Sequence, residues 1–177
     1  MKWKINVIAS IGFICGAVFG IAGSIFEDSV MQMCSYEISS VGLIAASALL
    51  TIKFLNEKKE ILSAVFLLLA IAEAVMSGGT ALGQTGAQAS FGAGMALYVP
   101  AFLLISITKG FPLWSRITGV LATIPFLIAA SKIFMGELVL STSALPGAGY
   151  CLLTITAIGW IINLLREHKK MSFQTNN

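Results

Sequence analysis

The chain is poor in charged residues and in the residue types that most often carry chemistry. Asp, Glu, Lys and Arg make up only 11% of its 177 residues, and His168 is the single histidine. One histidine excludes haem held by paired histidines and argues against a metal site built on histidine. The three cysteines, Cys15, Cys34 and Cys151, lack the Cys-x-x-Cys spacing of thiol oxidoreductases. We therefore expect neither a bound metal nor a cofactor.

Sequence motifs of common enzymes are missing as well. The sequence contains no P-loop, no Gly-x-Ser-x-Gly and no His-Glu-x-x-His segment. Serine and glutamate residues are present, but none can be assigned to a nucleophile–base pair. These absences weigh against an enzyme, although a membrane-embedded enzyme stays open as a third possibility.

Apolar residues, in contrast, make up 57% of the chain. A soluble domain of this length cannot bury so much apolar surface, whereas a lipid bilayer accepts it. Backbone polar groups find no water in lipid, so the spanning segments must be helices or a closed barrel. The apolar runs are continuous and do not alternate, which favours helices of roughly 17–25 residues. The sequence predicts an all-α integral membrane bundle of six transmembrane helices, at about 5–26, 34–54, 61–79, 91–108, 117–135 and 147–165.

The basic residues predict how the spans are oriented. With six spans, ten of the eleven fall on one side of the membrane: Lys2, Lys4, Lys53, Lys58, Lys59, Lys109, Arg116, Arg166, Lys169 and Lys170. Loops rich in lysine and arginine stay on the cytoplasmic side. We expect a plasma-membrane protein with both termini in the cytoplasm. The net charge of +3 is dispersed over four short segments, so we expect the lipid bilayer and not nucleic acid as its surroundings.

Aromatic residues follow the same division. Trp3, Trp114 and Trp160 fall toward the predicted inner side, and Tyr36 and Tyr150 toward the outer side. Amphipathic rings prefer the two membrane–water interfaces. We expect these five side chains to lie there.

The predicted outer side is acidic. Its acids are Glu27, Asp28, Glu37 and Glu137, against Lys132 as the one base. A negative mouth would concentrate cations, but the same asymmetry also arises wherever the basic residues are retained inside. We favour the second explanation.

The first span admits a second interpretation as a signal peptide. Two lysines precede an apolar run that ends in the small residues Ala22, Gly23 and Ser24. The run of about 22 residues is long for a signal peptide, so we expect a first transmembrane helix. Residues 1–170 then form one domain, followed by a disordered polar tail at 171–177.

Glu73 is the one acidic residue well inside a predicted span. Ser77, Thr80 and Gln84 follow it at offsets of 4, 7 and 11, so all four share a stripe if the helix continues that far. Desolvation favours a neutral carboxyl group there. The stripe is then either a polar lining that contacts an ion or ligand, or a hydrogen-bonded lock between helices. Both interpretations stay open.

Lys132 is the lone base near the predicted outer end of the fifth span. Glu73 across the bundle and Glu137 five residues further on are its two candidate partners. The simplest alternative is that its ammonium group reaches the lipid headgroups.

Proline and glycine mark three further segments. Pro100 and Pro125 lie in the middle of neighbouring spans, where each removes a backbone hydrogen bond and predicts a kink. The glycine-rich stretch 78–94 reads as a flexible outer loop or as a re-entrant segment. Gly12, Gly16 and Gly20 form one small-residue face on the first span. That face predicts close helix packing, within the monomer or as a homo-oligomer seam.

Two functional classes remain. The first is a transporter or channel-like protein for an ion or small polar solute, with Glu73 as the coupling group and the proline-containing spans as moving parts. The second is a non-transporting accessory or structural subunit that binds a membrane partner through the glycine face. A water-accessible cavity shared by Glu73, Gln84 and Lys132 would favour the first class, and a tightly packed interior the second.

Overall fold

The computed structural model describes residues 2–175, without the side chains of Lys2, Gln84 and residues 168–175. The described residues form seven helices and no strand. They are α1 (Lys2–Ile25), α2 (Ser29–Asn56), α3 (Glu60–Thr80), α4 (Gly83–Gly86), α5 (Gln88–Ile107), α6 (Leu113–Phe134) and α7 (Ala144–Thr175).

Six of these helices are long and apolar enough to cross a membrane, and only α4 is short. The predicted all-helical bundle of six spans is thus confirmed. The largest difference at the start of a helix is at α2, which begins five residues earlier than expected. Asp28 caps this end, because its side chain accepts a hydrogen bond of 2.9 Å from the backbone N–H of Met31. Helix α7 is recorded to Thr175, which includes most of the stretch expected to be a tail, and residues 176–177 lie outside the described residues.

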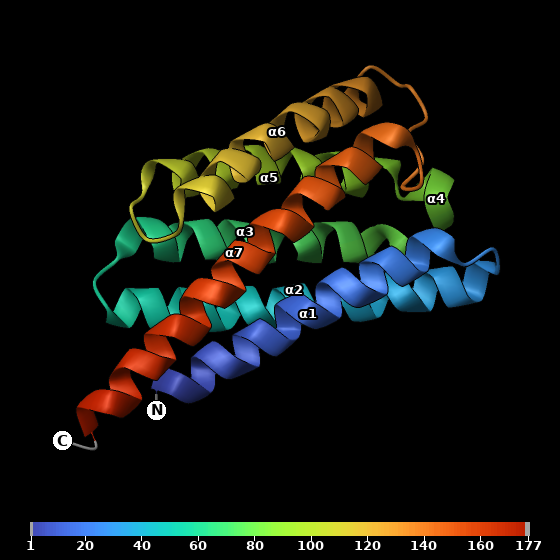
Figure 1. The fold of residues 1–177 in the computed structure, drawn as a ribbon. Helices are drawn as coiled ribbons and strands as arrows, with labels where there is room; N and C mark the ends of the chain where they lie inside the picture. Colours follow the sequence, from blue (N-terminus) through green and yellow to red (C-terminus); the bar gives the residue numbers. More distant parts are fainter. Residues whose placement is uncertain (1, 176–177) are drawn as a thin grey trace.

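The six long helices form a ring in which each packs against its neighbours. The order is α1, α2, α3, α5, α6 and α7, and α7 returns to contact α1 (Figure 1). Both termini and the connections 57–59 and 108–112 lie at one end of the bundle. This is called the basic end below, since the ten basic residues named above belong to the segments there. The connections 26–28, 81–87 and 135–143 lie at the other end, called the acidic end.

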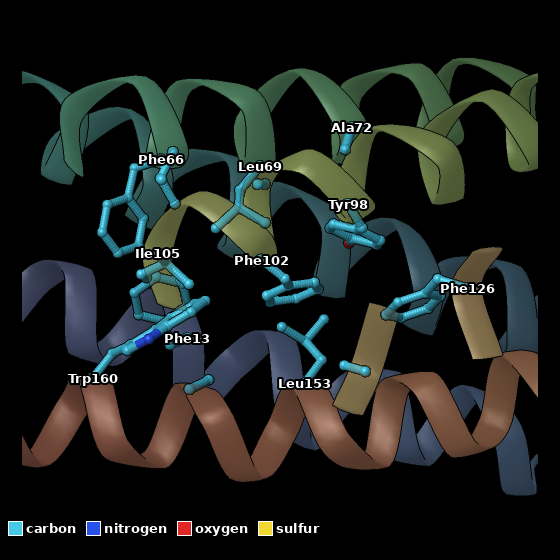
Figure 2. Close-up of a cluster of buried hydrophobic side chains, with 14 of the residues drawn as sticks. Phe13, Phe66, Leu69, Ala72, Tyr98, Phe102, Ile105, Phe126, Leu153 and Trp160 are labelled. Atoms are coloured by element: carbon cyan, nitrogen blue, oxygen red, sulfur yellow. The ribbon is translucent and has the colours of Figure 1, made fainter. Parts of the chain in front are cut away.

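The interior of the basic half is filled by aromatic rings, called the aromatic column below. Its members are Phe13, Phe54, Phe66, Phe102, Phe111 and Trp160 (Figure 2). The Trp160 ring centroid lies 5.3 Å from that of Phe66 and 5.4 Å from that of Phe13. Trp160 is buried in this column, so its predicted position at the membrane surface is wrong. Ring pairs at these separations add to the stabilisation from burial.

The outer surface of the ring is apolar. On α1, large aliphatic side chains are half exposed on the face turned away from the bundle: Ile8, Ile11, Ile14, Val18 and Ile21. The other long helices expose similar residues. Lipid tails would cover these side chains, which matches the six apolar spans.

The glycine face of α1 packs against α2 within the same chain. A Cβ atom added to Gly12 would lie 2.6 Å from the carbonyl oxygen of Gly42, and one added to Gly16 would lie 2.5 Å from Leu43. Ser39 also donates a hydrogen bond of 2.7 Å to the carbonyl oxygen of Gly16. The expectation of packing within the monomer is confirmed. The face is occupied by α2 and is therefore not free to serve as a homo-oligomer seam.

The glycine-rich stretch 78–94 is mostly helical, so the expected flexible loop is wrong. Only Ala81, Leu82 and Ala87 lie outside helices between Gly78 and Gly94. The glycines are used for close packing: a Cβ atom on Gly94 would lie 2.2 Å from the side chain of Met76. Helix α4 then turns the chain from α3 into α5.

We predict that Gly16→Leu destabilises the bundle. The added side chain would have to displace Leu43 in a filled interface, at a cost of about 1–3 kcal/mol. The measurement is thermal unfolding in detergent, with Val18→Leu on the exposed face of the same helix as control. Equal unfolding temperatures for the two variants would contradict the packing described here.

Candidate functional site

Glu73 lies on the inner face of α3 and is held by hydroxyl groups from two other helices. Glu73 is buried, with only 4% of its surface exposed. Tyr98 of α5 donates a hydrogen bond to Oε1, and Ser40 of α2 donates one of 3.0 Å to Oε2. One carboxyl group thus joins α2, α3 and α5 in the interior.

The hydroxyl groups of Tyr98 and Ser40 can bind both the ionised and the protonated carboxyl group of Glu73. A hydroxyl group can donate to a carboxylate, and it can also rotate to accept from a protonated carboxylic acid. Neither protonation state of Glu73 therefore leaves a buried polar atom without a partner. A backbone N–H or an arginine at the same position would stabilise only the charged form.

A second polar contact lies one helical turn closer to the acidic end. Ser77 of α3 donates a hydrogen bond of 2.8 Å to Oε2 of Glu37, which belongs to α2. Glu73 and Ser77 are four residues apart on α3, and Glu37 and Ser40 are three apart on α2. Because α2 and α3 are antiparallel neighbours, the two carboxyl groups follow one another along the same interface.

The rest of the predicted stripe is not assembled. Thr80 is the last residue of α3, and its hydroxyl group donates to the carbonyl oxygen of Met76, at 3.5 Å. Gln84 belongs to α4. The first residue of this helix, Gly83, has a φ of +68°. The side chain of Gln84 lies outside the described part of the structure. The helix does not continue from Glu73 to Gln84, because the chain turns at residues 81–82, so the condition for one shared stripe is not met.

Lys132 is not a partner of Glu73. Its ammonium nitrogen lies 2.6 Å from Oε2 of Glu137, and both side chains are largely exposed at the acidic end. Of the two predicted partners, Glu137 is confirmed. Glu73 and Lys132 therefore have separate polar partners.

Pro100 lies inside α5 and Pro125 inside α6, and neither helix is interrupted at its proline. Pro100 is exposed on the outer surface of α5, and Pro125 is buried in α6. Each adjoins a ring of the interior: Tyr98 precedes Pro100 by two residues, and Phe126 follows Pro125. The centroids of these two rings are 4.9 Å apart.

A cavity of about 350 Å³ opens at the acidic end. It is bounded by the start of α2, the end of α3, the segment from α4 into α5, and the connection that precedes α7. Its lining residues are Ser29, Gln32, Met33, Tyr36, Thr80, Gly83, Ala87, Gln88, Phe91 and Ser141. Tyr36 was expected at the membrane surface, and here it faces this cavity.

Toward the basic end, ring contacts continue from the Glu73 site through the bundle. Tyr98 contacts Phe102 with ring centroids 5.6 Å apart, and Phe102 lies 6.4 Å from Trp160. Trp160 in turn contacts Phe111 at 6.1 Å, in the connection between α5 and α6. The basic half is thus filled by packed rings, several of which Figure 2 shows, whereas the cavity lies at the acidic end.

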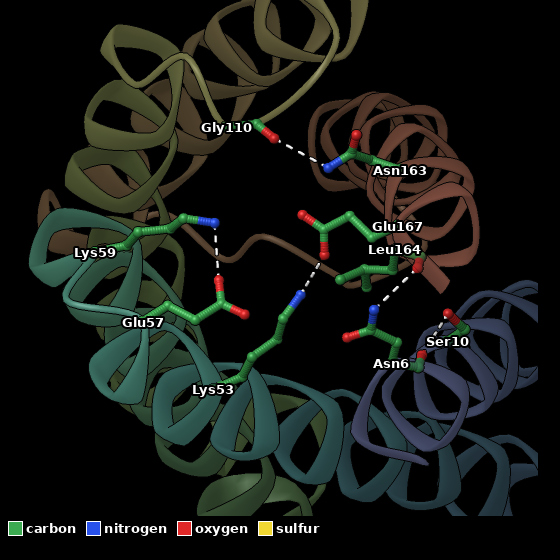
Figure 3. A network of polar contacts seen from close by, with 9 residues as sticks. All are labelled: Asn6, Ser10, Lys53, Glu57, Lys59, Gly110, Asn163, Leu164 and Glu167. Atoms are coloured by element: carbon green, nitrogen blue, oxygen red, sulfur yellow. Dashed lines mark hydrogen bonds and ion pairs between the residues drawn. The ribbon is translucent and has the colours of Figure 1, made fainter. Parts of the chain in front are cut away.

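A buried ion pair at the basic end was missed by the sequence reasoning. Lys53 of α2 is only 3% exposed, and its ammonium nitrogen lies 2.5 Å from Oε2 of Glu167 on α7 (Figure 3). We expected Lys53 only to mark the basic side at the end of the second span, and it lies inside α2. The signal was available: Lys53 follows an apolar run, and Glu167 is the one acid in the basic C-terminal segment.

Two asparagines fasten α7 at the same end. Asn6 of α1 donates a hydrogen bond of 2.9 Å to the carbonyl oxygen of Leu164, and Asn163 donates one of 3.0 Å to that of Gly110 (Figure 3). The amide oxygen of Asn6 is buried without a hydrogen-bond partner. Together with the ion pair, these bonds connect α7 to α1, α2 and the 108–112 connection.

The described part of the chain contains no grouped metal-ligating residues and no paired cysteines. No three residues among its histidines, cysteines, aspartates and glutamates are grouped so that they could hold a metal ion. Cys15, Cys34 and Cys151 are free.

No protein-family model, no curated protein and no solved structure matches this chain.

We predict that Lys53 and Glu167 are energetically coupled. Removing either partner by Lys53→Met or Glu167→Leu leaves a polar group without its partner, at a cost of about 1–3 kcal/mol. In the double variant the loss should be smaller than the sum of the single losses. The measurement is a double-mutant cycle of unfolding free energies, with the exposed pair Lys132 and Glu137 as control, for which we expect less than about 1 kcal/mol. Additive losses at Lys53 and Glu167 would contradict the ion pair.

Proposed function

We propose that this protein is a small membrane transporter in which Glu73 binds and releases a proton that exchanges with the acidic end. The observation that carries the proposal is the buried carboxyl group of Glu73 between the hydroxyl groups of Tyr98 and Ser40. An ionisable group in the interior of an apolar bundle is costly and is most often functional.

The arrangement of polar groups supports access from the acidic end. The contact between Ser77 and Glu37 stands between Glu73 and that end, at the interface of α2 and α3. On the other side of Glu73, the aromatic column and the fastened α7 fill the basic half. A transporter closed on one side and accessible from the other has this asymmetry.

The prolines support movement near the site. Each removes one backbone hydrogen bond from its helix, which lowers the cost of bending there. Pro100 and Pro125 adjoin Tyr98 and Phe126, whose rings contact each other beside Glu73. Bending of α5 or α6 at these points would separate the two rings and change the contact between Tyr98 and Glu73.

We further propose that the chain lies in the plasma membrane with the basic end in the cytoplasm. The support is the concentration of lysine and arginine in the segments of that end. The acidic end, with its cavity, would then face outward.

Cysteine labelling of intact cells tests this orientation. We expect Thr142→Cys, in the connection before α7, to react with a membrane-impermeant maleimide. We expect Asn56→Cys, at the basic end, to react only after permeabilisation. Both variants are made with the three native cysteines replaced by serine. Labelling of Asn56→Cys in intact cells would contradict the proposed orientation.

Flux measurements test the role of Glu73. The protein is reconstituted in liposomes that contain a pH-sensitive dye, and a panel of ions and small solutes is supplied outside. We expect Glu73→Gln to abolish pH-dependent flux, because an amide of the same size cannot release a proton. Tyr98→Phe should reduce the flux, since it removes one of the two hydroxyl partners.

Two controls separate coupling from folding. Glu137→Gln removes an exposed carboxyl group at the acidic end and should leave flux unchanged. Thermal unfolding should show that Glu73→Gln remains folded. Equal pH-responsive flux in the wild-type protein and Glu73→Gln would remove the coupling role.

An accessory, non-transporting role is the second candidate. It is favoured by the aromatic column, because packed rings fill the basic half and none of them lines the cavity at the acidic end. The glycine face of α1 is already covered by α2, so a membrane partner would have to bind another surface. Absence of flux for every solute in the wild-type protein would support this second role.

A further inference from the structure

The cavity at the acidic end has a lining without charge. Its polar members are hydroxyl and carboxamide groups, from Ser29, Gln32, Tyr36, Thr80, Gln88 and Ser141. Its apolar members include Met33 and the ring of Phe91. The volume of about 350 Å³ is at the lower end of the roughly 300–1,000 Å³ typical of small-molecule sites.

Three acidic residues of the acidic end are engaged in other contacts. Asp28 caps α2, Glu37 accepts a hydrogen bond from Ser77, and Glu137 pairs with Lys132. None of these residues lines the cavity. A charged solute would have to lose its hydration shell without gaining an opposite charge, which is unfavourable.

One wall of the cavity is a connection held in place by a side chain. The carboxamide of Gln88 donates to the carbonyl oxygen of Val139 and accepts from the backbone N–H of the same residue, both at 3.0 Å. The side chain of Val139 is buried. These contacts fasten the connection 135–143, and with it Ser141, beside the first turn of α5.

We propose that this cavity binds a small uncharged solute with one apolar face and a hydrogen-bonding edge. The ring of Phe91 and the side chain of Met33 would contact the apolar face. The hydroxyl groups of Ser29, Tyr36 and Ser141 would bind the polar edge, as in sites where a few polar groups orient a ligand against an apolar wall. The site is separate from the carboxyl group of Glu73, which does not line the cavity.

Equilibrium binding of three related molecules tests the site. Benzamide, benzoate and benzylamine share an aromatic ring and differ in charge. We measure their binding to the protein in lipid nanodiscs by saturation-transfer NMR and calorimetry. Benzamide should bind at least about tenfold more tightly than either charged molecule.

Three variants assign the binding to the cavity. Phe91→Ala should weaken benzamide by removing the ring, and Gln88→Ala should weaken it by releasing the 135–143 connection. Gln32→Glu adds a negative charge with little change in size, so it should weaken benzamide and strengthen benzylamine. Asn56→Asp makes the same chemical change at the basic end and should alter neither affinity.

The outcomes are distinguishable from those of the flux experiment. Glu73→Gln should bind benzamide like the wild-type protein, whether or not Glu73 couples transport. Equal affinity for the three molecules, no detectable benzamide binding, or benzamide binding unaffected by both Phe91→Ala and Gln32→Glu would overturn the proposal.

Discussion

The hydrogen-bonded carboxyl group of Glu73 is the constraint on which the interior of this bundle depends. In an apolar interior a carboxyl group must be neutral or fully partnered, because no water is present to solvate it. Its two hydroxyl partners come from α2 and α5, so one side chain sets how three helices approach one another. Tyr98 also begins the chain of ring contacts that reaches the basic end. The polar site and the aromatic column are therefore parts of one packing arrangement.

The two ends of the ring are built differently. At the basic end, the buried pair of Lys53 and Glu167 and the bonds from Asn6 and Asn163 hold α7 in place. At the acidic end the connections are longer, the ion pair is exposed, and a cavity with an uncharged lining opens. The bonds of the basic end join α7 to α1, α2 and the 108–112 connection, so this end should be the more rigid of the two. Access to Glu73 is accordingly proposed from the acidic end.

Hydrophobic patterning was sufficient to predict the class of fold, the number of spans and the close packing of Gly12, Gly16 and Gly20. It also identified Glu73, because a single acid in an apolar run stands out. It could not identify Tyr98 or Ser40 as partners, since contacts between α2, α3 and α5 depend on helix rotation and not on spacing along the chain. The same reason explains why the ion pair of Lys53 with Glu167 was missed and why Trp160 was assigned to the membrane surface. Thr80 and Gln84 were placed on one stripe with Glu73 only on the condition that the helix continued to residue 84, and α3 ends at Thr80.

The central claim is that Glu73 exists in two protonation states within the folded bundle. Infrared difference spectroscopy of the protein in lipid, recorded as the pH is changed, detects the carbonyl band of a protonated carboxylic acid directly. The account predicts a band that appears and disappears reversibly with pH in the wild-type protein, shifts in Tyr98→Phe, and is absent in Glu73→Gln. A band assigned to Glu73 that stays constant over the whole pH range in which the protein remains folded would contradict it. Glu73 would then serve only to hold α2, α3 and α5 together.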